Sequence, residues 1–84
     1  MKSRDLLSPR LRQIYDLLIE DIPLKEISFR LGLSENTARV YAFAIYKRFG
    51  LQTRIGLIHH HYKEYYGIDA RRAGEKNLTK GPQK

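Results

Sequence analysis

The stretch LKEISFRLGLSENTARVYAFAIYKRF, residues 24–49, limits what this 84-residue chain can fold into more than any other part of it. Apolar residues recur at helical spacing at its start, and Gly32 follows where a short helix would end. Ser34 is then typical of an N-cap, with Glu35 near the positive end of the next helix dipole. A small residue, Ser28, lets the two helix axes approach, and Gly32 permits a positive φ. The order of these elements predicts a helix-turn-helix.

One further helix is predicted on each side of this unit. Ser8 before Pro9 is typical of an N-cap and first helical residue, and that helix should end near Asp21. Thr53 predicts the N-cap of a last helix over residues 54–66, which Gly67 would end. The expected apolar stripes are Leu11, Ile14, Tyr15, Leu17 and Leu18; Leu24, Ile27 and Leu31, with Pro23 in the first turn; Ala38, Tyr41, Ile45 and Phe49; and Ile55, Ile58, Tyr62 and Tyr65, beside Leu57 and His61.

Strand signals are weak throughout, so we expect an all-α, four-helix domain over residues 1–67. Residues 70–84, ARRAGEKNLTKGPQK, contain two glycines, one proline and one leucine. Such a composition cannot bury enough apolar area to offset the entropy of ordering the chain. We therefore expect a flexible basic tail that is auxiliary to function, although a tail of this kind could also coat nucleic acid without sequence preference.

Size and composition exclude several classes of protein. An enclosed active-site cavity is not expected in so small a domain, and no nucleophile and base can be placed together, so we expect no enzyme. The chain has no cysteine, which excludes disulfides and thiolate zinc sites. His59, His60 and His61 point about 100° apart on a helix and cannot share a metal ion, so no cofactor is expected. Without a signal peptide or membrane span, the protein is expected in the cytoplasm.

Charge is distributed unevenly along the chain, whose net charge is +7. Residues 36–63 contain no acidic residue, and they carry five bases: Arg39, Lys47, Arg48, Arg54 and Lys63. A polyanion suits such a surface, because each phosphate that is neutralised releases counterions. An ordinary solvated helix face is the alternative interpretation of the same charges.

From Leu7 to about Tyr62 the chain resembles the DNA-binding domain of the LuxR and GerE family of bacterial transcription regulators. The segments that carry the resemblance are LLSPRLRQIYDLL, KEISFRLGLSENTARVY and IYKRFGLQTRIGLI. The chain departs from the family pattern at Leu11, where an acid is usual, and at Tyr41, where histidine is common. Ala42-Phe43-Ala44 replaces a run that is usually polar. Because only seven residues precede Ser8, we expect a freestanding module without a receiver or sensor domain.

The resemblance implies a protein that binds double-stranded DNA as a homodimer, with the recognition helix over residues 35–49 in the major groove. Position by position, it implies base-facing Arg39, Val40 and Phe43; phosphate-binding Lys25, Asn36, Thr37 and Lys47; and a dimer interface on the last helix, to which we assign Ile58, Tyr62 and Tyr65. An arginine can read guanine through two hydrogen bonds, and apolar side chains can pack on a thymine methyl group. RNA polymerase or another regulator is a possible protein partner.

A different function is also compatible with the sequence. The apolar surface expected from Val40, Ala42, Phe43 and Ala44 could bind another protein, as in a small interaction module or an inhibitor of a full-length regulator. Single residues also have structural interpretations: Lys25 could be merely solvated, Thr37 could bond to its own helix, and the tyrosines could close the core. Salt dependence separates the two functions, since DNA binding weakens steeply with salt and apolar association does not.

Overall fold

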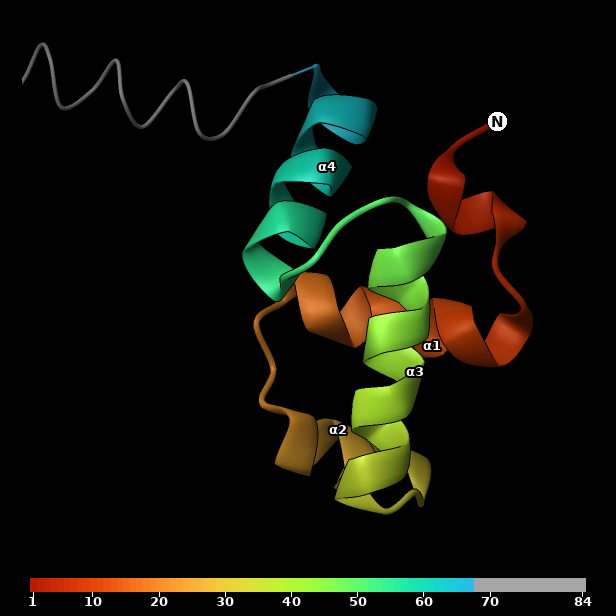
Figure 1. Cartoon of the computed structure of the whole chain (residues 1–84), viewed down its shortest axis with the longest axis vertical. Helices are drawn as coiled ribbons and strands as arrows, with labels where there is room; N and C mark the ends of the chain where they lie inside the picture. The colour runs from red at the N-terminus through yellow and green to blue at the C-terminus, as the bar shows by residue number, and fades with distance from the viewer. Residues whose placement is uncertain (68–84) are drawn as a thin grey trace, which may run out of the picture.

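The computed structural model describes residues 1–67, so the predicted basic tail, residues 68–84, lies outside the described part of the chain. The elements are a short 3-10 helix, η1 (Ser3–Leu6), and the helices α1 (Pro9–Ile19), α2 (Leu24–Leu31), α3 (Glu35–Arg48) and α4 (Arg54–Tyr66) (Figure 1). Residues 1–67 contain no strand. The all-α, four-helix prediction is confirmed. None of the helices in this range is long and apolar enough to cross a lipid bilayer.

Three helices begin at the predicted N-caps. The Ser8 hydroxyl accepts a hydrogen bond from the Leu11 amide at 3.3 Å, and the Ser34 hydroxyl accepts one from the Thr37 amide at 3.0 Å. Thr53 accepts from the Gly56 amide at 3.1 Å in the same way. Each bond satisfies an amide that has no partner within its helix. The starts of α1, α3 and α4 are therefore set locally.

The turn between α2 and α3 has the geometry that its sequence predicts. Gly32 has φ +68° and ψ 35°, in the left-handed region. The Leu33 amide donates to the Ser28 carbonyl at 2.8 Å and the Gly32 amide to the Phe29 carbonyl at 3.4 Å, which together form a Schellman motif. Ser28 is buried, and its hydroxyl donates to the Lys25 carbonyl at 2.7 Å. The small side chain thus satisfies its own polar group where the helices approach.

The connection from α1 to α2 differs from the prediction in two details. The first helix ends at Ile19 rather than near Asp21, which itself takes a positive φ of 62°. Pro23 is the N-cap of α2, with extended backbone, and not a residue of its first turn. Both differences arise from the same tight reversal, in which the Asp21 amide still donates to the Leu18 carbonyl at 3.0 Å.

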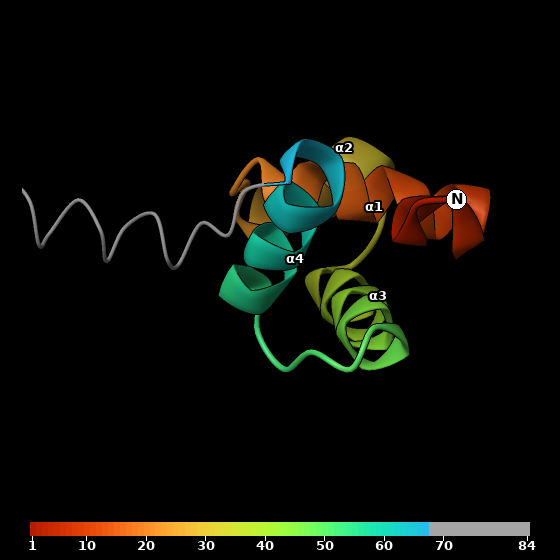
Figure 2. The same ribbon diagram turned by 90° about the horizontal axis from the view of Figure 1, so that it is seen from above.

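The core lies where α3 packs against α1 and α2, as Figures 1 and 2 show. Its buried members are Leu7, Ile14, Tyr15, Leu18, Ile27, Ala38, Ala42, Ile45, Tyr46 and Leu57. On α3 this corrects the prediction: Ala42 and Tyr46 are buried, whereas Tyr41 and Phe49 are only half-buried. Ala42 stands four residues after Ala38 and three before Ile45, on one face of the helix. It therefore belongs to the core and not to an outer apolar surface.

The packing of α4 also differs from the predicted stripe. Leu57 is fully buried, while Ile55 and Tyr62 are 64% and 41% exposed. Among the described elements α4 packs chiefly on α1 (Figure 2), and Leu57 is the one buried residue of this helix. The sequence offers two neighbouring apolar rows on this helix, and the crossing with α1 selects the row that contains Leu57.

An N-terminal segment that sequence patterns did not predict connects α1 with α4. Arg4 on η1 donates two hydrogen bonds of 2.7 Å to the Asp16 carboxylate on α1. The amide and the hydroxyl of Ser3 donate to Glu64 on α4, at 2.9 Å and 2.7 Å. Residues at the two ends of the described chain are thereby held together.

Candidate nucleic-acid interface

The outer surface of α3 is an exposed helix face that carries five of the predicted site residues. Asn36, Arg39, Val40, Phe43 and Lys47 are all exposed along it, opposite the buried row that begins at Ala38. An α-helix rises 1.5 Å per residue, so this face extends about 16 Å from Asn36 to Lys47. The major groove of B-DNA is wide enough to admit an α-helix with its side chains.

The first turn of α3 combines a helix N-terminus with polar side chains. The Ser34 hydroxyl donates to the Thr37 hydroxyl oxygen at 2.8 Å while it accepts from the Thr37 amide. Thr37 therefore does bond to its own helix cap, as the structural interpretation expects. Its hydroxyl oxygen serves as the acceptor in that bond, so its own proton stays available for a phosphate oxygen. Asn36 is exposed beside it.

Arg39 lies one turn further along α3 and is paired with an acid of the same helix. Its Nη2 atom lies 3.6 Å from a carboxylate oxygen of Glu35, and both side chains are about half exposed. The pairing is coulombic, because 3.6 Å is longer than a hydrogen bond. The guanidinium donors are therefore not consumed by Glu35.

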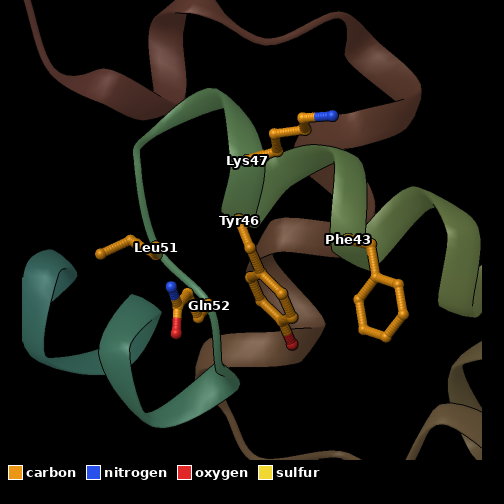
Figure 3. A pocket seen from close by; sticks show the side chains of 5 residues that line it. All are labelled: Phe43, Tyr46, Lys47, Leu51 and Gln52. Carbon is orange, nitrogen blue, oxygen red and sulfur yellow. The ribbon is translucent and has the colours of Figure 1, made fainter.

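The middle of the face is apolar. Val40 is 55% exposed and Phe43 is 58% exposed. A shallow hollow of about 280 Å³ opens beside Phe43 and is lined by Phe43, Tyr46, Lys47, Leu51 and Gln52. Figure 3 shows the Phe43 and Tyr46 rings on one side of α3 and the Lys47 ammonium turned away from them. The ring centroids of Phe43 and Tyr46 are 6.0 Å apart. The exposed ring of Phe43 is thus supported by a buried neighbour.

Two predicted phosphate ligands lie on different helices. Lys25 is exposed in the first turn of α2, which packs beside the first half of α3, and Lys47 is exposed in the last turn of α3 (Figure 1). Arg48 is exposed next to Lys47. Exposed positive charge is therefore present on α2 and in the last turn of α3.

Arg54 does not join this surface, although it belongs to the acid-free run in the sequence. Its Nη1 atom donates to the Ile22 carbonyl at 2.6 Å and lies 3.7 Å from Asp21. The guanidinium thus holds the α1–α2 connection against the start of α4. No local sequence pattern indicates this role, because its partners lie more than thirty positions away.

The predicted dimer residues on α4 have different environments. Tyr62 is exposed, and Ile58 is half-buried. Tyr65 stacks on His61, with ring centroids 4.4 Å apart, and the Lys2 ammonium lies 5.3 Å from its ring centroid. Ile55 and Tyr66 are exposed as well. Their spacing from Tyr62 is seven and four residues, which places all three on one helix face.

Two of the three consecutive histidines, His60 and His61, make different contacts. The His61 ring nitrogen Nδ1 lies 2.9 Å from the Tyr15 hydroxyl, and partial burial lowers the pKa of His61. His60 stacks on Phe49 and lies 3.0 Å from the Ser3 hydroxyl. No group of three histidine, cysteine, aspartate or glutamate side chains within residues 1–67 is arranged to hold a metal ion.

The sequence patterns predicted no role for one exposed aromatic side chain. Phe29 on α2 is almost fully exposed, and no predicted role falls on it. Its position could have been read from the helical wheel, since Ile27 and Ser28 face α3 and leave Phe29 on the outer side.

Comparison with known proteins finds one family. The model of the GerE family, described as bacterial regulatory proteins of the luxR family, matches residues 5–61. The match begins within η1, covers α1, α2 and α3 completely and extends to residue 61 of α4, so it includes the exposed face of α3. No curated protein and no solved structure matches the chain.

Proposed function

The chain belongs to the luxR family of bacterial regulatory proteins, a family of DNA-binding transcription regulators, and we propose that it acts as a homodimer with α3 in the major groove. The observation that carries the proposal is the outer face of α3. It combines a polar first turn, a guanidinium, an exposed apolar centre and a terminal lysine on a helix whose opposite face is buried.

Base recognition is assigned to the middle of this face. Arg39 would donate two hydrogen bonds to the O6 and N7 atoms of a guanine. Val40 and Phe43, which expose apolar atoms, suit the methyl group of thymine. With few other donors in the centre of the helix, we expect guanine and thymine at adjacent positions of the half-site to dominate its sequence preference.

Phosphate binding is assigned to the residues around that centre. Lys25 and the first turn of α3, through Asn36 and Thr37, would hold one backbone, and Lys47 would hold a phosphate at the far end. Phosphate contacts fix the register of the protein on DNA and carry no sequence information themselves. Each contact that is lost should reduce the slope of log K against log salt by roughly 0.9.

Dimerisation is assigned to the exposed row of α4. Ile58 and Tyr62 belong to the proposed interface, and the exposure of Ile55 and Tyr66 extends it by one turn at each end. Tyr65 would contribute less, because its ring already stacks on His61 and has the Lys2 ammonium over it. A two-fold dimer would place its two α3 helices on half-sites about 34 Å apart, one turn of B-DNA.

The DNA-binding proposal is tested by selection of binding sites from random duplexes at physiological salt. The dissociation constant of the selected site is then measured for the wild type and for Arg39→Ala. A lost bidentate guanine contact weakens binding by roughly 1–3 kcal/mol, or about fivefold to 150-fold. Lys63→Ala is the matched control, because it removes one exposed positive charge from α4, which packs on α1. If Arg39→Ala binds the selected site as tightly as Lys63→Ala does, or if no sequence is enriched, the assignment of α3 is wrong.

The dimer is tested separately by sedimentation of the wild type and of Tyr62→Glu, with and without the selected duplex. We expect the charged side chain to shift the protein toward the monomer. The variant should then bind a duplex with two half-sites no more tightly than a duplex with one. Lys63→Ala again serves as the control on the same helix. A wild type that stays monomeric on a two-half-site duplex would contradict the dimer.

A second candidate function is binding of another protein through exposed Val40, Phe43 and Ala44. The surface is smaller than the sequence predicted, because Ala42 is buried in the core. Its exposed apolar atoms favour this alternative, whereas the neighbouring Arg39 and Lys47 favour DNA. Affinity that is insensitive to salt, together with no enrichment of any duplex, would decide for the protein partner.

A further inference from the structure

Glu35 is the only acidic residue on the described α3 helix, and it stands beside the residue to which guanine recognition is assigned. Its carboxylate lies 3.6 Å from Nη2 of Arg39, one helical turn further on. About half of each side chain is exposed. An acid at this place weakens the attraction of α3 for phosphate, so the charge acts against DNA affinity in general.

The geometry of the pair also restricts Arg39. An unpaired arginine side chain has several flexible torsions and can reach either a base or a nearby phosphate. A carboxylate at one end of the guanidinium favours the rotamers that keep Nη2 near the first turn of α3. Because the contact is longer than a hydrogen bond, the donors remain free for a planar acceptor pair such as guanine O6 and N7.

We propose that Glu35 is a positioning residue for sequence recognition: it holds Arg39 in the conformation that reads guanine and lowers affinity for DNA that lacks this base. The inference rests on the proposed function, because it concerns the same face of α3. Selectivity then arises from two effects of one carboxylate. It orders the guanidinium before binding, and its repulsion of phosphate is offset only where Arg39 makes the correct base contact.

The test measures a ratio of affinities with the full chain. Dissociation constants are determined for the selected duplex and for the same duplex with the guanine position changed. For Glu35→Gln we expect tighter binding to the changed duplex and a ratio that falls about twofold to fivefold, the range that half-exposed ion pairs support. Glu35→Asp keeps the charge but withdraws the carboxylate by one methylene. It should lower the ratio without a general gain in affinity.

The matched control is Glu26→Gln on α2. Glu26 forms an ion pair with Arg30 at the same i, i+4 spacing and similar exposure, so the substitution changes net charge equally. It should leave the ratio unchanged. Glu35→Gln is also made in an Arg39→Ala background, where it should no longer alter the ratio. Circular dichroism of each variant verifies that the helices are retained.

Three results would overturn the inference. The first is an equal change of the ratio in Glu35→Gln and Glu26→Gln, which would indicate net charge alone. The second is no change of the ratio in Glu35→Gln. The third is an effect that persists without Arg39, which would mean that Glu35 contacts a base itself, such as the amino group of cytosine. Failure of the proposed function is distinguishable, since the wild type would then enrich no duplex at all.

Discussion

Gly32 connects α2 to the proposed recognition helix, and its replacement by alanine should destabilise the domain. The residue has φ +68°, and a Cβ atom built on it would meet no atom within 4 Å. Steric clash with the rest of the fold is therefore absent, and the effect of Gly32→Ala isolates the backbone. The cost comes from placing an L-residue in the left-handed region.

The magnitude follows from two opposing contributions. The left-handed conformation costs about 1–2 kcal/mol for alanine. Alanine also restricts the unfolded chain more than glycine does, which stabilises the folded state by about 0.4–1 kcal/mol. We expect a net loss of about 1 kcal/mol in the free energy of unfolding. For a domain of this size, that lowers the midpoint of thermal unfolding by about 4–8 °C. Asparagine tolerates the left-handed region better, so Gly32→Asn should lose less.

Urea unfolding followed by circular dichroism measures these differences. Gly56→Ala is the matched control, because Gly56 lies within α4 without a positive φ, and its new Cβ would lie 3.4 Å from the Thr53 hydroxyl oxygen. Alanine is favoured over glycine in a helix by about 0.5–1 kcal/mol, so this variant should be as stable as the wild type or more so. The reasoning is refuted if Gly32→Ala is not destabilised, or if asparagine costs as much as alanine.

Two other substitutions test the packing of α4. Leu57→Ala should lower the free energy of unfolding by about 2–5 kcal/mol, because the side chain is fully buried, whereas Ile55→Ala should cost far less at protein concentrations where the chain is monomeric. Equal costs in urea unfolding would mean that the buried row is misassigned. At Glu64, partial burial opposes the charged form, but the hydrogen bonds from Ser3 outweigh it and lower the pKa below the ordinary 4.5. This contribution to stability is present above pH 4.5 and is lost as the pH falls through the lower folded pKa, so Ser3→Ala should differ from the wild type more at pH 7 than at pH 3. A difference that is the same at both pH values would exclude the carboxylate as its cause.

Much of the fold could be predicted from short stretches of sequence. The caps at Ser8, Ser34 and Thr53 and the turn at Gly32 are all confirmed, and each depends on bonds between residues no more than five positions apart. The family resemblance, now matched over residues 5–61, rests on the same local order. The candidate interface was predicted in outline because it begins at one of these caps.

The buried rows were predicted less well, because two adjacent rows of a helix can both be apolar. Ala42 lies in the core, although its position predicted the outer surface. On α4 the apolar spacing predicted burial of the row that contains Ile55 and Tyr62, whereas Leu57 in the neighbouring row is the fully buried residue. A helical pattern gives the period but not which row meets the neighbouring helix. That choice depends on the angle at which α3 and α4 cross α1.

The sequence by itself determined the four α-helices, the starts of α1, α3 and α4 and the turn that joins α2 to α3, since these features depend on interactions within one or two turns. Only the tertiary structure decided the contacts between distant positions. Ser3 binds Glu64, Arg54 binds the Ile22 carbonyl, and the Tyr15 hydroxyl contacts His61. These pairs form because helix packing brings the side chains together, and no local pattern encodes which polar groups will then face each other.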